Sequence, residues 1–265
     1  MAQLKDDCFA FGGELMPLAD ALRVLGERVQ PVTGTETVDI RAAPGRILAE
    51  DVTAGRDVPP HDNSAVDGYA VYHDDLDAKA ETRMPVVGRV AAGHPLGRPA
   101  KRGEAVRIFT GAPMPVGADG RQSTGPDTVF MEEDCEPEGD FVRLPPGLKR
   151  GSNRRAAGED VKKGEVILKR GQRLRPQEIG LAASVGRNAL LMRKRLRAAV
   201  FSTGDEVRDP AGDAPPGCIF DANRFVLMAL LENLGARVTD LGILPDRLAA
   251  VGDALKRAAP DHDLL

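Results

Sequence analysis

Residues 197–265 constrain the fold of this chain more than any other part, because short apolar strands alternate there with amphipathic helices. The run 198–201 is compact and apolar, and a helix over 222–234 carries leucines at i, i+3, i+4 and i+7. The run 238–244 is the next strand, and a second helix follows over 246–260. This order of elements predicts the beginning of a doubly wound, parallel α/β sheet.

The final residues, Asp263, Leu264 and Leu265, begin a third strand. A parallel sheet is stable when several strands pair and both faces are covered, so we expect a sheet that continues and a chain that is C-terminally truncated. The alternative is a small domain that a partner subunit completes, because bare sheet edges are rarely tolerated. We expect Asp221 to cap the start of the first helix and Gly235 to end it.

The rest of the chain has a different pattern. Residues 16–29 have helical apolar spacing, and residues 37–40 alternate as a short strand. From about 59 to 146, Pro and Gly separate short apolar runs, which predicts β-strands rather than helices. We therefore expect a mixed α/β, multidomain protein with a composite region over 1–190, a β-rich subdomain within it at about 60–150, and an incomplete α/β domain over 191–265.

Composition disfavours several classes of protein. The net charge is −4, whereas nucleic-acid-binding proteins usually carry a basic surface. No apolar run approaches the ~20 residues of a membrane helix, and no secretory signal is expected at the N-terminus. The three cysteines, Cys8, Cys135 and Cys218, form no C-x-x-C pair, so we expect neither a disulfide framework nor a zinc site. A reducing, cytoplasmic compartment is favoured.

Two loops would lie at the carboxyl edge of the predicted parallel sheet, where ligands bind in such folds. The first loop offers hydroxyls and a flexible backbone to a phosphate or polar ring, through Ser202, Thr203 and Gly204. Asp205, Glu206 and Asp246 bring carboxylates to the same edge, which suggests a hard cation such as Mg²⁺. Asp246 is explained equally well as a helix N-cap, and Asp205 as a turn residue.

Two polar segments precede this domain. Residues 58–70 place two aspartates, an asparagine and a serine within six positions before an apolar strand, which fits either a functional loop or an ordinary Asx turn. Arg154 and Arg155 are followed closely by Glu159 and Asp160. Guanidinium groups suit oxyanions and a nearby carboxylate can hold a metal. The alternative is a surface cluster of salt bridges.

Residues 57–71 resemble the signature of the MoeA family, the molybdopterin molybdenumtransferases, which includes the E domain of gephyrin. Four further segments are similar to the family in the same order, at 107–115, 158–161, 201–206 and 221–224. Five segments in register make a chance match implausible. The resemblance covers essentially the whole chain from about residue 16.

The resemblance implies an enzyme of molybdenum cofactor biosynthesis. Members of the family insert molybdenum from molybdate into adenylyl-molybdopterin, release AMP and form molybdenum cofactor with the help of Mg²⁺. They are homodimers whose cleft uses both subunits. The resemblance also implies molybdopterin adenylyltransferase as the upstream donor and molybdoenzyme apoproteins as the downstream recipients.

The same resemblance implies roles for individual residues. By matching position, the catalytic acidic and hydroxyl residues are Asp67, Thr110, Asp160, Glu206 and Asp246. Three of these, Asp160, Glu206 and Asp246, are also the candidate metal ligands. The residues matched to substrate and anion binding are Asn63, Ser64, Arg154, Arg155, Ser202, Thr203, Gly204 and Asn223. Molybdate and pyrophosphate are both anionic, so such a site needs cationic donors and a cation, while Asp67 and Thr110 would orient molybdate or water.

The chain also departs from the family pattern. The loops expected to cradle the pterin phosphate would follow Leu265, so substrate binding by this chain alone is in doubt. Residues 120–127 are a loop extension with no functional account, and Ala156 stands where a second arginine is usual. Two other readings therefore stay open. One is a non-catalytic, dimerising remnant, and the other is a regulatory protein that binds a pterin or a nucleotide.

Overall fold

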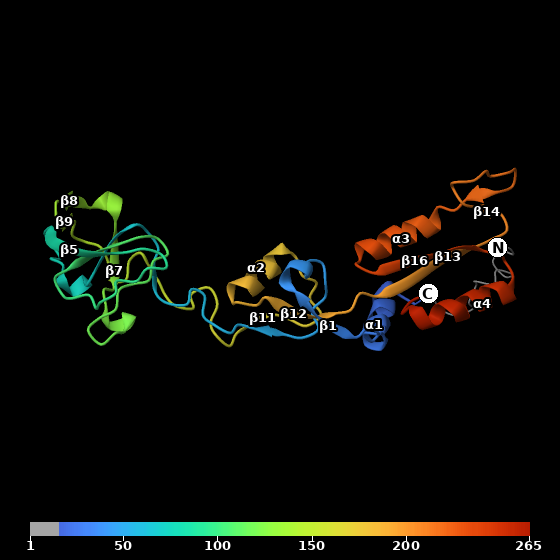
Figure 1. Cartoon of the computed structure of the whole chain (residues 1–265), viewed down its shortest axis with the longest axis horizontal. Coiled ribbons are helices and arrows are strands. Elements are labelled where there is room, and N and C mark those ends of the chain that lie inside the picture. The colour runs from blue at the N-terminus through green and yellow to red at the C-terminus, as the bar shows by residue number, and fades with distance from the viewer. Residues whose placement is uncertain (1–15) are drawn as a thin grey trace. The chain divides into compact units, whose positions relative to one another are not determined.

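The computed structural model describes residues 16–265 as two compact units of mixed α/β structure (Figure 1). One unit is Thr35–Arg193, and the other combines the described residues up to Gly34 with Lys194–Leu265. The division at residue 190 stays a prediction. Short 3₁₀ turns occur in both units, namely η1 (Ile40–Ala42), η2 (His73–Asp75), η3 (Gln122–Thr124), η4 (Glu132–Asp134) and η5 (Ala259–Asp261).

A six-stranded sheet forms the β-rich part of the first unit, as the spacing of turns and apolar runs predicts. In the order β7-β4-β6-β5-β9-β8, its strands are β7 (Thr128–Met131), β4 (Gly68–Val71), β6 (Ala105–Ile108), β5 (Thr82–Val90), β9 (Phe141–Leu144) and β8 (Glu136–Glu138). Alternate residues of β4 enter different apolar clusters. Tyr69 packs with Phe130, whereas Ala70 packs with Val106. Both faces of β4 are therefore buried, and β4 lies between β7 and β6 in the sheet.

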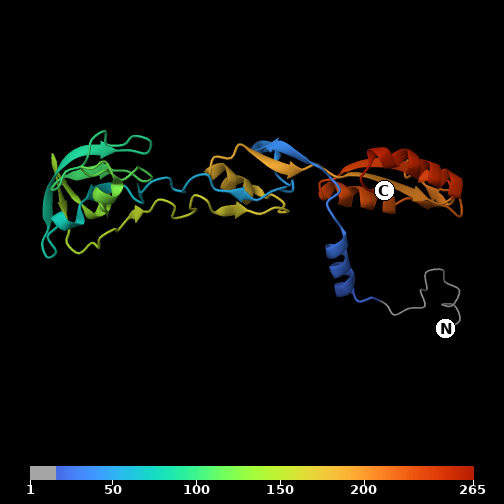
Figure 2. The ribbon, with the colours of Figure 1, turned by 90° about the horizontal axis from the view of Figure 1, so that it is seen from below.

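The remainder of this unit consists of short ladders and one helix. Strand β1 (Thr35–Asp39) pairs antiparallel with β12 (Ala189–Arg193), and the two strands lie side by side in Figure 2. Strand β2 (Val52–Thr53) pairs with β11 (Val166–Leu168), near helix α2 (Pro176–Ser184). Leu48, Leu174 and Met192 are among the buried residues of their shared core.

One residue of the predicted strand 37–40 is placed differently. Ile40 begins the 3₁₀ turn η1 instead of extending β1. The carboxylate of Asp39 accepts a hydrogen bond of 2.8 Å from the backbone N–H of Arg41, and this local bond favours a turn over continued strand pairing.

The second unit contains the predicted parallel sheet. Its elements are α1 (Leu18–Arg28), β13 (Arg197–Thr203), β14 (Val207–Arg208), β15 (Ile219–Phe220), α3 (Asn223–Asn233), β16 (Arg237–Leu244) and α4 (Leu248–Ala258). Strand β13 pairs in parallel with β16, and a parallel bridge joins Ala198 to Leu264. Figure 1 shows α3 and α4 on opposite sides of the β13–β16 pair. The crossover through α3 leads from β13 to β16, and the crossover through α4 returns past β13 to Leu264, which is the doubly wound arrangement.

The predicted helix boundaries are confirmed at α3 and corrected at α4. The Asp221 carboxylate accepts a hydrogen bond of 3.2 Å from the N–H of Arg224, and Gly235 has φ +91° just beyond the helix. The N-cap predicted for Asp246 is wrong, because α4 begins after Arg247 and no side chain caps it. Asp246 is therefore not needed as a cap, which leaves its carboxylate available for another role.

Two predictions from composition can be compared with the described residues. Within 16–265, no helix has both the length and the apolar character to cross a membrane. Cys135 and Cys218 are free thiols, whereas Cys8 lies outside the described residues.

Gly68 provides a test of the sheet. A Cβ on this residue would lie 1.7 Å from the carbonyl oxygen of Phe130 in the neighbouring strand, so G68A must push β4 and β7 apart. We expect G68A to lower the free energy of unfolding by roughly 1–3 kcal/mol or more, measured by urea denaturation.

The matched control is G180A in helix α2, where a new Cβ would meet nothing within 4 Å. This variant should raise stability by roughly 0.5–1 kcal/mol, because alanine loses less backbone entropy than glycine in a helix. Equal stability of the two variants would contradict the packing described for β4.

Candidate functional site

A pair of two-residue strands joins the signature segment to the arginine segment. Strand β3 (Asn63–Ser64) pairs antiparallel with β10 (Arg154–Arg155), so that Ser64 lies opposite Arg154 and Asn63 opposite Arg155. The N–H of Ala65 also donates to the carbonyl of Asn153 at 2.8 Å. The predicted anion-binding residues from two distant segments therefore lie on one small ladder.

The turn that carries Thr110 is attached to the other edge of β3. The N–H of Ser64 donates to the carbonyl of Ala112 at 3.0 Å, and the N–H of Gly111 donates to the carbonyl of Ser64 at 2.9 Å. The hydroxyl of Ser64 is buried and donates to the carbonyl of Val66 at 2.6 Å. The backbone of Ser64 therefore joins the signature loop to the arginine segment and to the Thr110 turn. Its hydroxyl stabilises the loop through the bond to Val66.

Asp67, at the end of the signature loop, is hydrogen-bonded to Thr110. One carboxylate oxygen of Asp67 accepts hydrogen bonds of 2.7 Å from both the backbone N–H and the hydroxyl of Thr110. These two bonds, the backbone one first, hold the pKa of Asp67 below its ordinary value. Both residues are exposed, so an ionised carboxylate and a hydroxyl face the solvent together.

The two arginines of β10 are held by carboxylates. Arg154 donates from Nη2 to Asp62 at 2.5 Å. Arg155 donates from Nη2 to Asp160 at 2.6 Å and from Nε to Glu159 at 3.2 Å. These contacts with Asp160 and Glu159 raise the pKa of Arg155. In this structure the two arginines therefore form a cluster of salt bridges, which is the alternative given for this segment above. An anion that binds them would have to compete with the carboxylates of Asp62, Glu159 and Asp160.

The other predicted residues lie at the carboxyl edge of the β13–β16 pair. Ser202 and Thr203 are opposite Ile243 and Leu244 in the parallel register. Gly204 follows with φ +139°, and a Cβ there would lie 2.9 Å from a carboxylate oxygen of Glu206. The Glu206 carboxylate therefore lies against the Gly204 backbone, next to the end of the strand.

Asp246 and Asn223 are both exposed in this unit, Asp246 after β16 and Asn223 at the first position of α3. Asp160, the third predicted metal ligand, belongs to the Thr35–Arg193 unit. Within residues 16–265, no three His, Cys, Asp or Glu side chains gather closely enough to hold a metal ion. The metal-binding set of Asp160, Glu206 and Asp246 therefore stays a prediction.

Arg224 is a residue of this region that the sequence interpretation missed. It is 3% exposed, and its guanidinium contacts the carboxylates of Asp221 (2.8 Å), Asp209 (2.8 Å) and Asp240. These contacts join α3 to β16 and to the loop that follows β14. The i, i+3 spacing of Asp221 and Arg224 was the one signal for this pair, and nothing in the sequence pattern pointed to Asp209 or Asp240.

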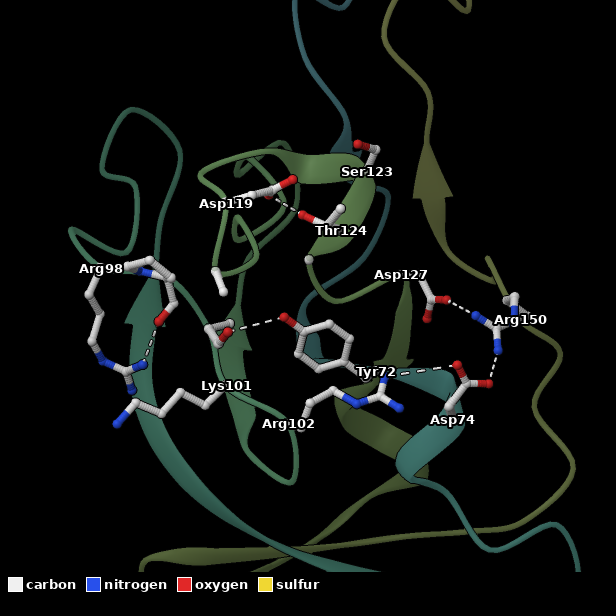
Figure 3. A pocket seen from close by; sticks show the side chains of 14 residues that line it. Tyr72, Asp74, Arg98, Lys101, Arg102, Asp119, Ser123, Thr124, Asp127 and Arg150 are labelled. Atoms are coloured by element: carbon white, nitrogen blue, oxygen red, sulfur yellow. Dashed lines mark hydrogen bonds and ion pairs between the residues drawn. The ribbon is translucent and has the colours of Figure 1, made fainter.

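A separate cleft of about 900 Å³ lies in the β-rich part of the first unit (Figure 3). The ring of Tyr72 and the extended loop 120–127 contribute to its walls. Its arginines are largely neutralised, since Arg150 contacts Asp74 and Asp127, and Arg98 contacts Glu104. This charge balance gives the cleft no clear preference for an anion such as molybdate.

Two protein-family models together match most of the chain. Residues 16–186 match the family model described as "MoeA N-terminal region (domain I and II)", and residues 199–265 match "Probable molybdopterin binding domain".

The chain belongs to the MoeA family.

Individual relatives extend this result. "Molybdopterin molybdenumtransferase" of Haemophilus influenzae is 37% identical over 95% of this chain and 60% of its own length, and the Nostoc protein of the same name is 35% identical over 87% and 52%. The crystal structure of the molybdopterin biosynthesis moeA protein from Pyrococcus horikoshii OT3 aligns with a TM-score of 0.84 at 31% identity, covering 95% of this chain and 66% of that one. The chain therefore spans between half and two thirds of the length of these MoeA proteins.

The contact between Asp67 and Thr110 makes a prediction about pH. In T110V the hydroxyl bond is lost while the backbone bond remains, so the pKa of Asp67 should rise partway toward its ordinary value of 3.8. Because the folded pKa is depressed, the bond stabilises the fold above pH 3.8 and this contribution is lost as the pH falls through the folded value. A carboxyl-detected NMR titration measures the shift.

Glu138 is an internal control in the same titration, because its pKa is held low by Arg143 and Arg83 and should not change in T110V. An unchanged pKa for Asp67 in T110V would contradict the described contact.

Arg224 makes a prediction about stability. R224L leaves the buried carboxylate of Asp221 without its partner, so we expect the unit that contains the parallel sheet to lose roughly 3–5 kcal/mol in chemical denaturation. The control is R257L, an exposed arginine of α4 without an ion pair within the described residues. A loss in R224L no larger than that in R257L would show that the network does not hold this unit together.

Proposed function

We propose that this chain carries the chemistry of a molybdopterin molybdenumtransferase. The reaction inserts molybdenum from molybdate into adenylyl-molybdopterin, releases AMP and forms molybdenum cofactor. The observation that carries this proposal is the assembly of the signature loop, the Thr110 turn and the arginine segment around β3 and β10. The relatives named molybdopterin molybdenumtransferase support it.

Asp67 and Thr110 would orient molybdate or a water molecule. A carboxylate with a lowered pKa is a weak base at neutral pH, so Asp67 suits hydrogen bonding better than proton abstraction. The Thr110 hydroxyl donates to Asp67 and its oxygen still has lone pairs to accept a further hydrogen bond. The pair therefore offers acceptors to water or to a protonated oxyanion and no cationic charge of its own.

The cationic donor for an anion would be Arg155. Its planar fork suits bidentate binding of an oxyanion, but Asp160 and Glu159 occupy it in the described structure. Anion binding at Arg155 therefore requires one carboxylate to move away. Asp160 has a second role open to it as a metal ligand, which would release the guanidinium.

The Mg²⁺ ion is a further part of the proposal. Magnesium is usually held by one or two carboxylates together with water and substrate phosphates, so it does not need a closed protein cage. Glu206 and Asp246, which lie near the carboxyl edge of one parallel strand pair, fit that chemistry. Asp160, in the Thr35–Arg193 unit, is proposed as a further candidate ligand. Bound Mg²⁺ would neutralise the negative charge of the pyrophosphate.

The proposed partners follow from the same reaction. We propose a homodimer, supported by α1, whose Leu18, Leu22 and Leu25 are all more than half exposed. Such an apolar face on an amphipathic helix favours contact with another protein surface. Molybdopterin adenylyltransferase would supply the substrate and molybdoenzyme apoproteins would take the product. A cytoplasmic location of the reaction is part of the same proposal. The same exposed face supports the alternative of a dimerising, non-catalytic protein.

The pairing of Arg155 leads to a prediction that separates binding from turnover. Without Mg²⁺, D160N should bind molybdate roughly two- to fivefold more tightly than the unaltered chain, because a competing charge of an exposed ion pair is removed. Isothermal titration calorimetry measures this affinity. Weaker molybdate binding by D160N would contradict this competition, because it would mean that the Asp160 carboxylate helps Arg155 to bind the anion.

Complementation tests the proposed function directly. The 265-residue chain is expressed in a bacterial strain that lacks its own molybdenumtransferase, and the activity of a molybdenum-dependent enzyme is measured. Catalysis by this chain requires activity to return with the unaltered chain and with the exposed control E27Q, and to fall at least tenfold with D67A. No activity from a folded, expressed chain would reject catalysis by this chain and favour the dimerising alternative.

A further inference from the structure

The loop extension 120–127 has a specific contact with the signature loop. The side-chain amide of Gln122, in η3, accepts a hydrogen bond of 3.0 Å from the N–H of Asp62 and donates one of 3.0 Å to the carbonyl of the same residue. It also donates to the carbonyl of Met114 at 2.9 Å. One amide thus contacts both backbone groups of Asp62, whose carbonyl also accepts a hydrogen bond of 2.8 Å from the N–H of Met114.

The extension is held firmly enough to act in this way. Gly117 and Gly125 allow two backbone segments to approach closely. A Cβ on Gly117 would lie 2.2 Å from the carbonyl oxygen of Thr124, and one on Gly125 would lie 2.1 Å from that of Pro115. The Asp119 carboxylate accepts a hydrogen bond of 2.9 Å from the N–H of Arg121 and another from the Thr124 hydroxyl. Gln122 is therefore carried by a braced loop.

The contact with Gln122 leads directly to the arginine segment. The Asp62 carboxylate accepts a hydrogen bond of 2.5 Å from Arg154 on one oxygen and one of 2.7 Å from the N–H of Ala157 on the other. The backbone of Asp62 is thus held by Gln122 together with the N–H of Met114, and its side chain holds the segment that leads to Glu159 and Asp160. This chain of contacts connects the extension to the carboxylates that compete for Arg155.

We propose that Gln122 is a positioning residue that sets the backbone of Asp62, so that its carboxylate holds Arg154 and Ala157 in the geometry that oxyanion binding needs. Groups behind the binding residues commonly set their orientation in this way. The expected change in molybdate binding rests on the proposed function, whereas the expected change in the position of Arg154 and Ala157 does not. If Gln122 only stabilised the fold, its loss would speed hydrogen exchange throughout the unit to a similar extent.

The geometric test uses hydrogen exchange, measured by NMR, at the amide of Ala157. Q122M keeps the volume of the side chain and removes its three hydrogen bonds, and Q122A is a second variant in case the thioether packs poorly. We expect the Ala157 amide to exchange up to about tenfold faster in either variant, the factor that corresponds to about one lost hydrogen bond. S123A, the adjacent residue on the same turn, should leave this rate unchanged.

The control for general destabilisation is V142A, a fully buried residue of β9. It should speed exchange across the sheet, including the amide of Ala70, whereas Q122M should affect Ala157 more than Ala70. An unchanged Ala157 rate in both Gln122 variants, or an equal change at Ala70, would overturn the proposal.

The functional test is molybdate affinity, measured by calorimetry at a temperature where every variant is folded. We expect Q122M to bind molybdate about tenfold more weakly than the unaltered chain, while S123A and V142A bind it normally. Equal affinities in Q122M and V142A would overturn the positioning role. If the unaltered chain does not bind molybdate at all, the proposed function fails, and the Ala157 exchange rates still decide whether Gln122 sets the geometry.

Discussion

The pairing of β3 with β10 is the contact on which the candidate site in the Thr35–Arg193 unit depends. Two residues on each strand hold the signature loop against the arginine segment, and the backbone of Ser64 joins the Thr110 turn to the same ladder. Strands this short contribute few hydrogen bonds, so they need support from their surroundings. That support comes from β7, where the Val129 carbonyl accepts a hydrogen bond from the Asn153 side chain, and from Asp62 and Gln122.

Charge pairing is the second constraint on this site. Arg154 and Arg155 are already paired with carboxylates, Arg154 with Asp62 and Arg155 with Glu159 and Asp160. Such pairing keeps the segments in place but lowers the electrostatic attraction for a dianion, since the negative charges must be displaced or screened. An anion site of this kind gains affinity when a cation draws the carboxylates away, and this links the proposed roles of Asp160 and Mg²⁺.

The sequence predicts the elements of the fold better than their contacts. The helix over 222–234 and the strands around it follow from local apolar spacing, which is strong over segments of this length. Ile40 and the cap of α4 were predicted wrongly, because single hydrogen bonds decide such boundaries. The ladder of β3 and β10 could not be predicted, since two residues carry no periodicity.

The same limit applies to individual site residues. Resemblance to the family pointed to Asp67 and Thr110, which the structure places in direct contact. It gave no role to Arg224, whose partners are distant in sequence, or to Gln122, which belongs to an extension outside the family pattern. Both act through partners that a linear pattern does not reveal, because the contacts exist only after the chain has folded.

Diffraction at the molybdenum absorption edge, from crystals of this chain grown with molybdate, tests the central claim most directly. The claim is that the signature loop, the Thr110 turn and the arginine segment form one oxyanion site. The account predicts an anomalous peak within hydrogen-bonding distance of Thr110 or Arg155, with the Arg155 guanidinium released from at least one carboxylate. A peak found only in the cleft beside Tyr72, or no peak at saturating molybdate, would contradict it.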